Sequence, residues 1–354
     1  MAFADKPQEL MMEDGDYYGI IQCPSVGLYY SETSSYQYNL LAVGLFNIFF
    51  SIPTFIFNFL ILLTFIKQTN LRKLGNTILI SLSLCDLLSG MIAQPVLVSL
   101  IAILLTKKPT EIPCDLVTSS SVLGYTLACI SLLTVSFISL ERYLAIFHPF
   151  LYERSVTKRW LYTGCASIWV VSIVMMPALL LVKILHVYFF WVNAILITFT
   201  YVWNTFIYVR ITTRANELRR EQRTLQSRFG APKAPGCNQS KATKVAGSII
   251  LALLLCYLPQ VAVSVWQLIK KSRFLYEYCE YWTMTFGLLN PGLNPIFYCY
   301  YNSQIRKELF LLLGFSPHNV SPANSNSTTP QILPHRMVND TKKKRSATSI
   351  TFAD

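Results

Sequence analysis

The chain has 354 residues, of which 53% are hydrophobic and only 14% charged, and its mean hydropathy is +0.42. Soluble domains carry about 25% charged residues, so this composition excludes an ordinary soluble enzyme and favours a protein of the lipid bilayer. The net charge of +12 follows the pattern of membrane loops described below, and we expect no nucleic-acid partner.

The N-terminal segment, residues 1–37, is polar, and its acidic residues outnumber its single base, Lys6. No apolar signal-peptide core precedes Tyr36, so we expect no cleaved leader. The sequence predicts an acidic extracellular tail ahead of the first membrane span.

Seven nearly uncharged segments of about 20 residues or more follow, and each predicts a transmembrane helix. Between Trp160 and Val209 the only charged residue is Lys183. A single helix over that run would be about 75 Å long, more than twice the hydrocarbon core, so the chain must fold back near 183–186. The predicted fold is an all-α membrane protein, a seven-transmembrane helix bundle with spans at about 38–66, 76–105, 113–146, 160–183, 186–210, 242–269 and 277–301.

A short amphipathic helix is expected at about 303–314, which completes the bundle domain of residues 38–314. Residues 315–354 are rich in Ser, Thr, Asn and Pro, and we expect a disordered cytoplasmic tail there. Most of the 30 Lys and Arg residues fall in alternate loops and in this tail. The positive-inside rule therefore predicts a multi-pass protein of the plasma membrane with its N-terminus outside and its C-terminus in the cytoplasm.

In this topology Cys23, Cys114 and Cys279 face the oxidising side, where disulfides form. We expect a disulfide between Cys23 and Cys279, which leaves Cys114 free. The alternative is a bridge between Cys23 and Cys114.

Asp86 is the one ionisable residue deep in a span, where a charge is costly and points to function. Its candidate partners on other spans are Asn58, Ser131, Asn290 and Asn294. Such oxygen atoms suit a sodium ion or ordered waters, and the alternative is an acid that burial keeps neutral.

Two Asn-Pro pairs, 290–291 and 294–295, loosen the seventh span, and Pro259 makes a hinge beside Tyr257 in the sixth. Glu141 and Arg142 lie where the third span meets the cytoplasm. There the acid can hold the guanidinium until the bundle opens, which gives a two-state element. The alternative is a simple interfacial anchor.

Further motifs accompany these residues: Asn58, LSLCDLL around Asp86, ERYLAIFHPF (141–150), Trp169, Tyr208, CYLP (256–259) and NPIFY (294–298), the last followed by the basic stretch YNSQIRKELFLLL. In this order and spacing they resemble the rhodopsin-like (class A) G protein-coupled receptors over residues 38–314. The resemblance implies a cell-surface receptor that passes the binding of a ligand to heterotrimeric G proteins, with arrestin and receptor kinases as further partners.

The resemblance also implies residue roles. Arg142 would meet the C-terminal helix of the G protein in the open state, and Phe150 would be the loop plug into that protein. The full set of coupling and switch residues is Glu141, Arg142, Tyr143, Phe150, Tyr208, Tyr257, Pro259, Asn294, Pro295 and Tyr298. The sodium pocket would comprise Asp86, Ser131, Asn290 and Asn294.

The chain departs from the family at several positions. Tyr257 replaces the usual tryptophan of span six, and Thr200 stands where span five usually bulges at a proline. No acid near position 239 can lock Arg142 to span six, so we expect appreciable basal activity. The second outer loop is very short and has no cysteine to bridge to span three; within the family, these features are similar to the melanocortin, lipid and cannabinoid receptor group.

Alignment outward from the motifs places a ligand pocket in the outer half of the bundle. Gly124 stands where amine receptors keep a carboxylate, so we expect no biogenic amine; Leu288 replaces the lysine that binds retinal, so we expect no retinal and no cofactor beyond a structural sodium ion. An apolar pocket suits a lipid or another hydrophobic small molecule, and the acidic tail leaves a basic peptide open. The predicted pocket residues are Gly124, Tyr125, Ala128, Val192, Leu196, Gln260, Val261, Ser264, Met284 and Leu288.

Three rival classes remain. A receptor-like protein that does not signal would keep the motifs without coupling. A transporter or channel would need polar residues along a path or inverted repeats, and the deep polar residues here form one cluster. An intramembrane metalloenzyme would need ligands at one depth, and no histidine lies deep in a span.

Overall fold

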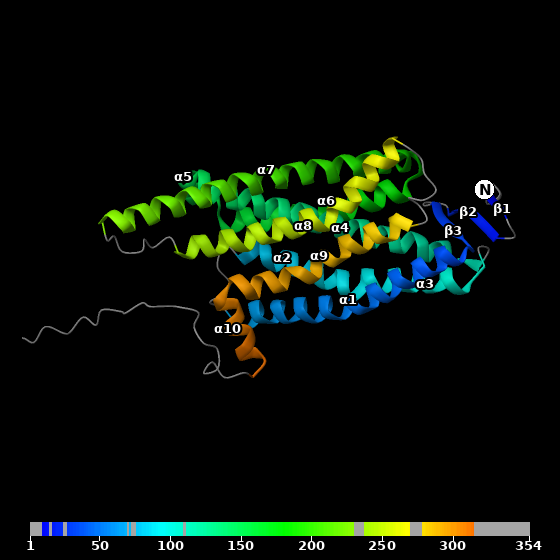
Figure 1. Ribbon diagram of the computed structural model, residues 1–354, viewed down its shortest axis with the longest axis horizontal. Coiled ribbons are helices and arrows are strands. Elements are labelled where there is room, and N and C mark those ends of the chain that lie inside the picture. Colours follow the sequence, from blue (N-terminus) through cyan, green and yellow to red (C-terminus); the bar gives the residue numbers. More distant parts are fainter. Residues whose placement is uncertain are drawn as a thin grey trace, which may run out of the picture. The chain divides into compact units, whose positions relative to one another are not determined.

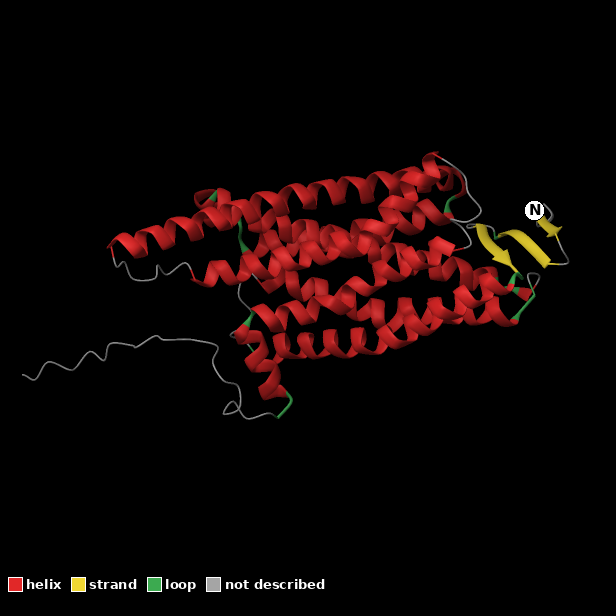
Figure 2. Cartoon of the chain, viewed as in Figure 1, coloured by secondary structure: helices red, strands yellow, loops and turns green. Residues whose placement is uncertain are grey.

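The computed structural model describes residues 9–13, 16–23, 27–68, 71, 76–108, 111–229, 237–269 and 278–314. Over these residues the chain forms a bundle of long helices with a small β-sheet at the N-terminal end (Figure 1 and Figure 2). The predicted all-α, seven-helix membrane bundle is confirmed. Six helices are long and apolar enough to cross a membrane within the described residues.

The seventh span is α9 (Glu280–Tyr301), whose 22 residues are long enough to cross a bilayer. Its two Asn-Pro pairs lower the mean hydropathy of this helix. The other spans are α1 (Ser34–Lys67), α2 (Thr77–Leu88) continued through a π-helical turn (Ser89–Ala93) into α3 (Gln94–Thr106), α4 (Cys114–Phe147), α6 (Lys158–Leu181), α7 (Lys183–Phe229) and α8 (Cys237–Ile269).

The fold-back between the fourth and fifth spans lies at Val182, between the end of α6 and the start of α7, slightly before the segment 183–186 where we expected it. Helix α6 begins with a cap, in which the Thr157 side chain accepts a hydrogen bond from the Trp160 backbone N–H at 3.2 Å. Helix α7 runs on to Phe229, well beyond the predicted end of the fifth span at residue 210.

Two short helices lie outside the spans. Helix α5 (Pro149–Ser155) follows α4, and α10 (Ser303–Leu312) follows α9. The Asn302 side chain caps α10 by accepting hydrogen bonds from the backbone N–H groups of Gln304 and Ile305, at 3.1 and 3.3 Å. This cap separates α10 from the membrane-spanning α9, so the predicted short helix is a distinct element (Figure 1).

Helix α1 approaches the second span very closely at the π-helical turn. A Cβ atom on Gly90 would lie 2.7 Å from the backbone nitrogen of Phe55, a distance that would force the helices apart. Glycine therefore permits the contact. Asn58 lies one turn further along α1, in the contact between α1 and the second span that also contains Asp86.

The N-terminal tail contains a structure that the sequence analysis missed. Strands β1 (Glu9–Glu13), β2 (Asp16–Gln22) and β3 (Gly27–Ser31) form an antiparallel sheet in the order β1-β2-β3. The tyrosine pairs 17–18 and 29–30 were the available signal, because aromatic residues favour strands. The acidic residues around them made the segment look like a plain solvated tail.

The end of this tail packs on the outer end of the bundle. Tyr30 and Tyr36 are buried there. Tyr30 also donates a hydrogen bond to the Glu32 carboxylate at 3.4 Å; burial, with the nearby negative charge of Glu32, raises the pKa of Tyr30 to about 12. The buried cluster around these tyrosines comprises Cys23, Leu40, Val43, Leu97, Leu100, Ile101, Leu104, Ile112, Val117 and Tyr281.

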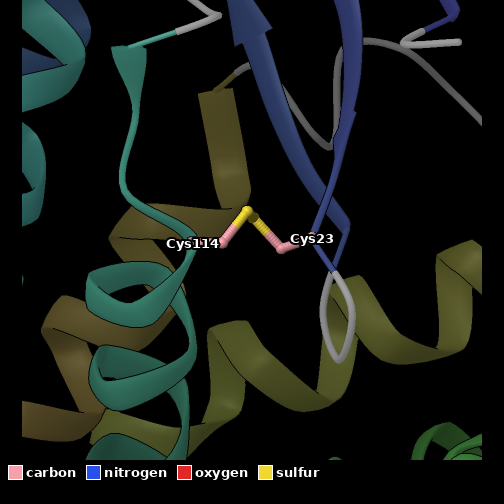
Figure 3. Close-up of a disulfide and its surroundings, with 2 residues drawn as sticks. All are labelled: Cys23 and Cys114. Atoms are coloured by element: carbon pink, nitrogen blue, oxygen red, sulfur yellow. A yellow bond between two sulfur atoms is a disulfide. The ribbon is translucent and has the colours of Figure 1, made fainter. Parts of the chain in front are cut away.

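A disulfide joins Cys23, which follows β2, to Cys114, the first residue of α4 (Figure 3). The expected pairing of Cys23 with Cys279 was wrong, and the alternative pairing is the one formed. Cys279 keeps a free thiol among the described residues. The pairing depends on tertiary packing. The tail packs over the outer end of α4, and this brings the Cα atoms of Cys23 and Cys114 to 5.3 Å from each other, a distance that a disulfide can span.

Replacing either bridged cysteine should destabilise the receptor. The bridge closes a chain separation of 91 residues, and removing a bridge of this kind costs about 2–4 kcal/mol. We expect Cys23→Ser and Cys114→Ser to lower the melting temperature of the purified protein, and both variants should lower it equally. The two variants should also lower surface expression equally. Cys279→Ser is the matched control and should change neither; a Cys279→Ser effect as large as that of Cys23→Ser would contradict this pairing.

Candidate functional site

The inner end of α4 holds a buried ion pair between neighbouring residues. The Arg142 guanidinium donates two hydrogen bonds to the Glu141 carboxylate. Glu141 is 2% exposed and Arg142 9%. A buried arginine bound to the adjacent acid is a restrained arginine, and it can reach another partner only by leaving this carboxylate.

A third residue, Tyr152 on α5, completes this arrangement. Its hydroxyl donates to Glu141 Oε1 at 2.6 Å. Burial, with the hydrogen bond to Glu141 and the negative charge of that residue, raises the pKa of Tyr152 to about 12, so the hydroxyl keeps its proton at physiological pH. Tyr152 was not among the predicted residues, because nothing in the spacing of the sequence shows that α5 folds back onto the end of α4.

The other predicted switch residues lie in the core of the bundle, at its surface or at its inner end. Tyr257, Tyr298, Asn294 and Pro295 are buried in the bundle, and Pro259 is half-buried. Phe150 is 87% exposed at the start of α5, where a protein partner can reach it. At the inner end, Tyr143 stacks on Phe147 with ring centroids 4.7 Å apart, and Tyr208 is half-buried against Gly247 of α8.

Two hydrogen bonds join members of the predicted polar cluster to neighbouring spans. The Asn294 amide donates to Asp86 Oδ2 at 2.7 Å, and the Asn58 amide donates to the Pro291 carbonyl at 3.1 Å. This second bond uses the carbonyl of an Asn-Pro pair and ties α1 to α9. Asp86, Asn58, Asn290 and Asn294 are fully buried.

Much of the hydrogen-bonding capacity of this cluster is unused. The following atoms have no hydrogen-bond partner among the described residues: Asp86 Oδ1, Ser131 Oγ, Asn58 Oδ1, Asn294 Oδ1 and both amide atoms of Asn290. Buried polar groups ordinarily have partners, and oxygen atoms of this kind fit a hard cation or ordered waters. No group of three or more His, Cys, Asp or Glu residues suited to a metal occurs in the described part of the chain.

Five of the ten predicted pocket residues border packed clusters of buried residues. Tyr125, Val192 and Leu196 pack around the buried Cys129 and Met176. A Cβ atom on Gly124 would meet no atom within 4 Å, so the position faces open space. Val261 borders the central core and Leu288 borders two other clusters, while Ala128, Gln260 and Met284 are half-buried. The side chain of Ser264 lies outside the described part of the structure.

Polar contacts near these residues were missed by the sequence analysis. Gln94, which is 1% exposed, donates to the Leu288 carbonyl at 3.4 Å. Asn47 of α1 donates to the Thr285 hydroxyl at 2.8 Å. Both bonds end on the same turn of α9, so they hold the outer half of that helix against α1 and α3. An amide in an otherwise apolar span was the available signal.

Comparison with known proteins assigns the chain to a family. Residues 57–298 match the family model described as 7 transmembrane receptor (rhodopsin family). The chain belongs to the rhodopsin family of seven-transmembrane receptors. It is 27% identical to the histamine H2 receptor of Cavia porcellus, over 73% of this chain and 76% of that protein, and 25% identical to the histamine H2 receptor of Canis lupus familiaris, over 74% and 77%. Relaxin-3 receptor 1 of Mus musculus is 33% identical over 24% of this chain and 21% of that protein.

Membership in this receptor family gives the general function. The protein is a multi-pass membrane receptor that signals through G proteins, and it is not an enzyme. The predicted class A resemblance is confirmed at this level. The relatives found are histamine and relaxin receptors, and none belongs by name to the melanocortin, lipid or cannabinoid group.

The Tyr152 hydrogen bond should restrain the receptor. Tyr152→Phe removes the donor to Glu141, a change worth about 1 kcal/mol, and we expect basal recruitment of G protein in cells to rise. Because the pKa of Tyr152 is raised, the wild-type bond persists at neutral pH and is lost only as the pH rises toward about 12. The control is Tyr162→Phe on α6, whose side chain is exposed; equal effects of the two variants would exclude a specific role for Tyr152.

Proposed function

We propose that this receptor binds a hydrophobic ligand in the outer half of its bundle and transmits binding to a heterotrimeric G protein through Arg142. The N-terminus lies outside the cell and the C-terminus in the cytoplasm. The distribution of Lys and Arg supports this orientation, and so does the disulfide at the N-terminal end, because disulfides persist in oxidising compartments.

The observation that carries the coupling proposal is the buried Glu141–Arg142 pair beside an exposed Phe150. An arginine that is restrained in one state and freed in another is a two-state element that a ligand can bias. In the open state Arg142 leaves Glu141 and contacts the C-terminal helix of the G protein, and Phe150 enters the same partner. Tyr208 and Tyr298 rearrange around Arg142, and the spans bend at Pro259 and Pro295, next to Tyr257 and Asn294.

Asp86, Ser131, Asn290 and Asn294 would hold a sodium ion in the closed state. The support is the set of buried oxygen atoms without partners around one carboxylate. A sodium ion there offsets the charge of Asp86 and fixes α2, α4 and α9 relative to one another.

The ligand is a lipid or another hydrophobic small molecule. Gly124 offers no carboxylate to an ammonium group and faces open space, which argues against an amine such as the histamine for which the H2 relatives are named. Two features support kinship with the melanocortin, lipid and cannabinoid group. The connection at Val182 is very short, and Thr200 stands in place of a proline. A basic peptide that contacts the acidic N-terminal sheet is the second candidate.

Arrestin and receptor kinases would be the further cytoplasmic partners. The proposal rests on family membership and on the Ser- and Thr-rich segment 315–354. That segment lies outside the described residues.

Arg142→Ala should abolish G protein recruitment. The variant removes the group that contacts the G protein, so basal and extract-stimulated recruitment in cells should fall to background at equal surface expression. Arg214→Ala is the control, since Arg214 is an arginine of the extended α7 paired with Glu217 at the surface. Full recruitment by Arg142→Ala would rule out this coupling role.

Sodium should stabilise the closed receptor through Asp86. In purified protein, replacing choline chloride by sodium chloride at equal ionic strength should raise the melting temperature, because an ion that binds only the folded state adds RT ln(1 + [L]/Kd) of stability. Asp86→Asn should remove this dependence, and Asp115→Asn, at the outer start of α4, should keep it. A sodium response that survives in Asp86→Asn would place the ion elsewhere or exclude it.

A further inference from the structure

A second buried polar network joins α4 to α7, apart from the cluster around Asp86. Ser139 Oγ donates to Asn204 Oδ1 at 2.6 Å. Asn204 Nδ2 donates to Ser136 Oγ at 2.9 Å and to the Thr200 carbonyl of its own helix at 2.8 Å. Ser139 and Asn204 are fully buried and Thr200 nearly so. We call these four residues the α4–α7 polar bridge.

The polar bridge differs from the central cluster because its key amide is satisfied. The Asn204 carbonyl oxygen accepts one hydrogen bond and the amide nitrogen donates two. The Ser139 hydroxyl lies at 2.9 Å from the Val135 carbonyl as well. A satisfied network in a low dielectric holds one arrangement, and lipid offers no water to replace a broken bond. The bridge is therefore a specific lock between two helices, and both amide hydrogens of Asn204 are already used in it.

The bridge lies one helical turn from the coupling residues on both helices. Ser139 precedes Arg142 by three residues and Asn204 precedes Tyr208 by four, a rise of about 5 Å. Further toward the inner end, the Arg210 guanidinium lies 5.4 Å from the centre of the Phe147 ring. Helices α4 and α7 pack side by side along this seam (Figure 1). The inner end of α7 cannot move away from α4 without breaking the bridge.

We propose that Asn204 is a positioning residue for G protein coupling. It holds α7 against α4 while Arg142 is bound to Glu141, and its release is part of the step that exposes Arg142. The inference rests on the proposed coupling role of Arg142 and adds a residue on another helix that acts through it. Asn204 does not touch the G protein in this scheme.

The test compares Asn204→Leu with Thr205→Val in the full-length receptor. Leucine is close to asparagine in size and removes all three bonds. Thr205 is the next residue, is half-buried, and its hydroxyl donates to the Tyr201 carbonyl of its own helix. We expect Asn204→Leu to raise basal G protein recruitment about fivefold or more, and Thr205→Val to leave it unchanged. The increase should vanish when Arg142→Ala is added.

Ser139→Ala provides a second, milder variant that decides the matter where Asn204→Leu fails to reach the cell surface. It should also raise recruitment, and unchanged recruitment in Ser139→Ala alone would overturn the bridge as the cause. Where Asn204→Leu does reach the surface, Ser139→Ala should add nothing to it, because the two residues share one bond. Independent additive effects would then overturn the bridge as well.

Hydrogen–deuterium exchange on purified protein supplies a readout that does not depend on coupling. Peptides over residues 196–210 should exchange faster in Asn204→Leu than in wild type or Thr205→Val. Faster exchange with unchanged recruitment, in a wild type whose recruitment depends on Arg142, would overturn the inference and leave a structural bond. If wild type and every variant recruit no G protein, the coupling proposal fails and the inference falls with it, while the exchange result still reports whether Asn204 restrains α7.

Discussion

The constraint on which this structure depends is that polar groups inside an apolar bundle must find partners within the protein. Helices satisfy the backbone, and each deep polar side chain has to be satisfied from a neighbouring span. Arg142 is paired with Glu141 of its own helix, the Asn58 amide donates to the Pro291 carbonyl of α9, and Asn204 bonds to two α4 serines. The Asn58 and Asn204 bonds cross between helices at fixed depths, so they set how these spans sit against one another far more specifically than apolar contact can.

The same constraint separates two kinds of polar cluster. Around Asp86, several buried oxygen atoms and the Asn290 amide lack a partner within the described residues, so they have capacity for an ion or waters. Around Asn204, both amide hydrogens and the carbonyl oxygen have partners, so the network holds or breaks as a unit. The two proposals follow this difference: a bound occupant at the centre and a lock between the inner ends of α4 and α7.

The sequence predicted the features that depend on local pattern. Apolar length gave the seven helices, and the order of the motifs placed Asp86, Arg142 and Tyr298 in a known family. It failed where distant segments meet. The partner of Cys23 depends on the packing of the tail over α4, and the sheet depends on register among three short strands. Tyr152 and Asn204 carried no signal beyond being a tyrosine in a loop and an amide in a span, because their roles depend on which helix faces them.

The absence of a proline at position 200 bears directly on the lock at Asn204. A proline would remove the N–H of residue 200 and loosen the turn that precedes Asn204. Thr200 keeps the turn regular, with its hydroxyl donating to the Leu196 and Ile197 carbonyls and its own carbonyl accepting from Asn204. A regular turn fixes the direction in which the Asn204 side chain leaves α7, and that direction is toward Ser136 and Ser139. The departure from the family pattern in span five and the polar bridge to α4 are therefore one feature. With no acid near position 239 to hold Arg142 from span six, the bonds that can restrain the inner end are those of Glu141, of Tyr152 and of this bridge.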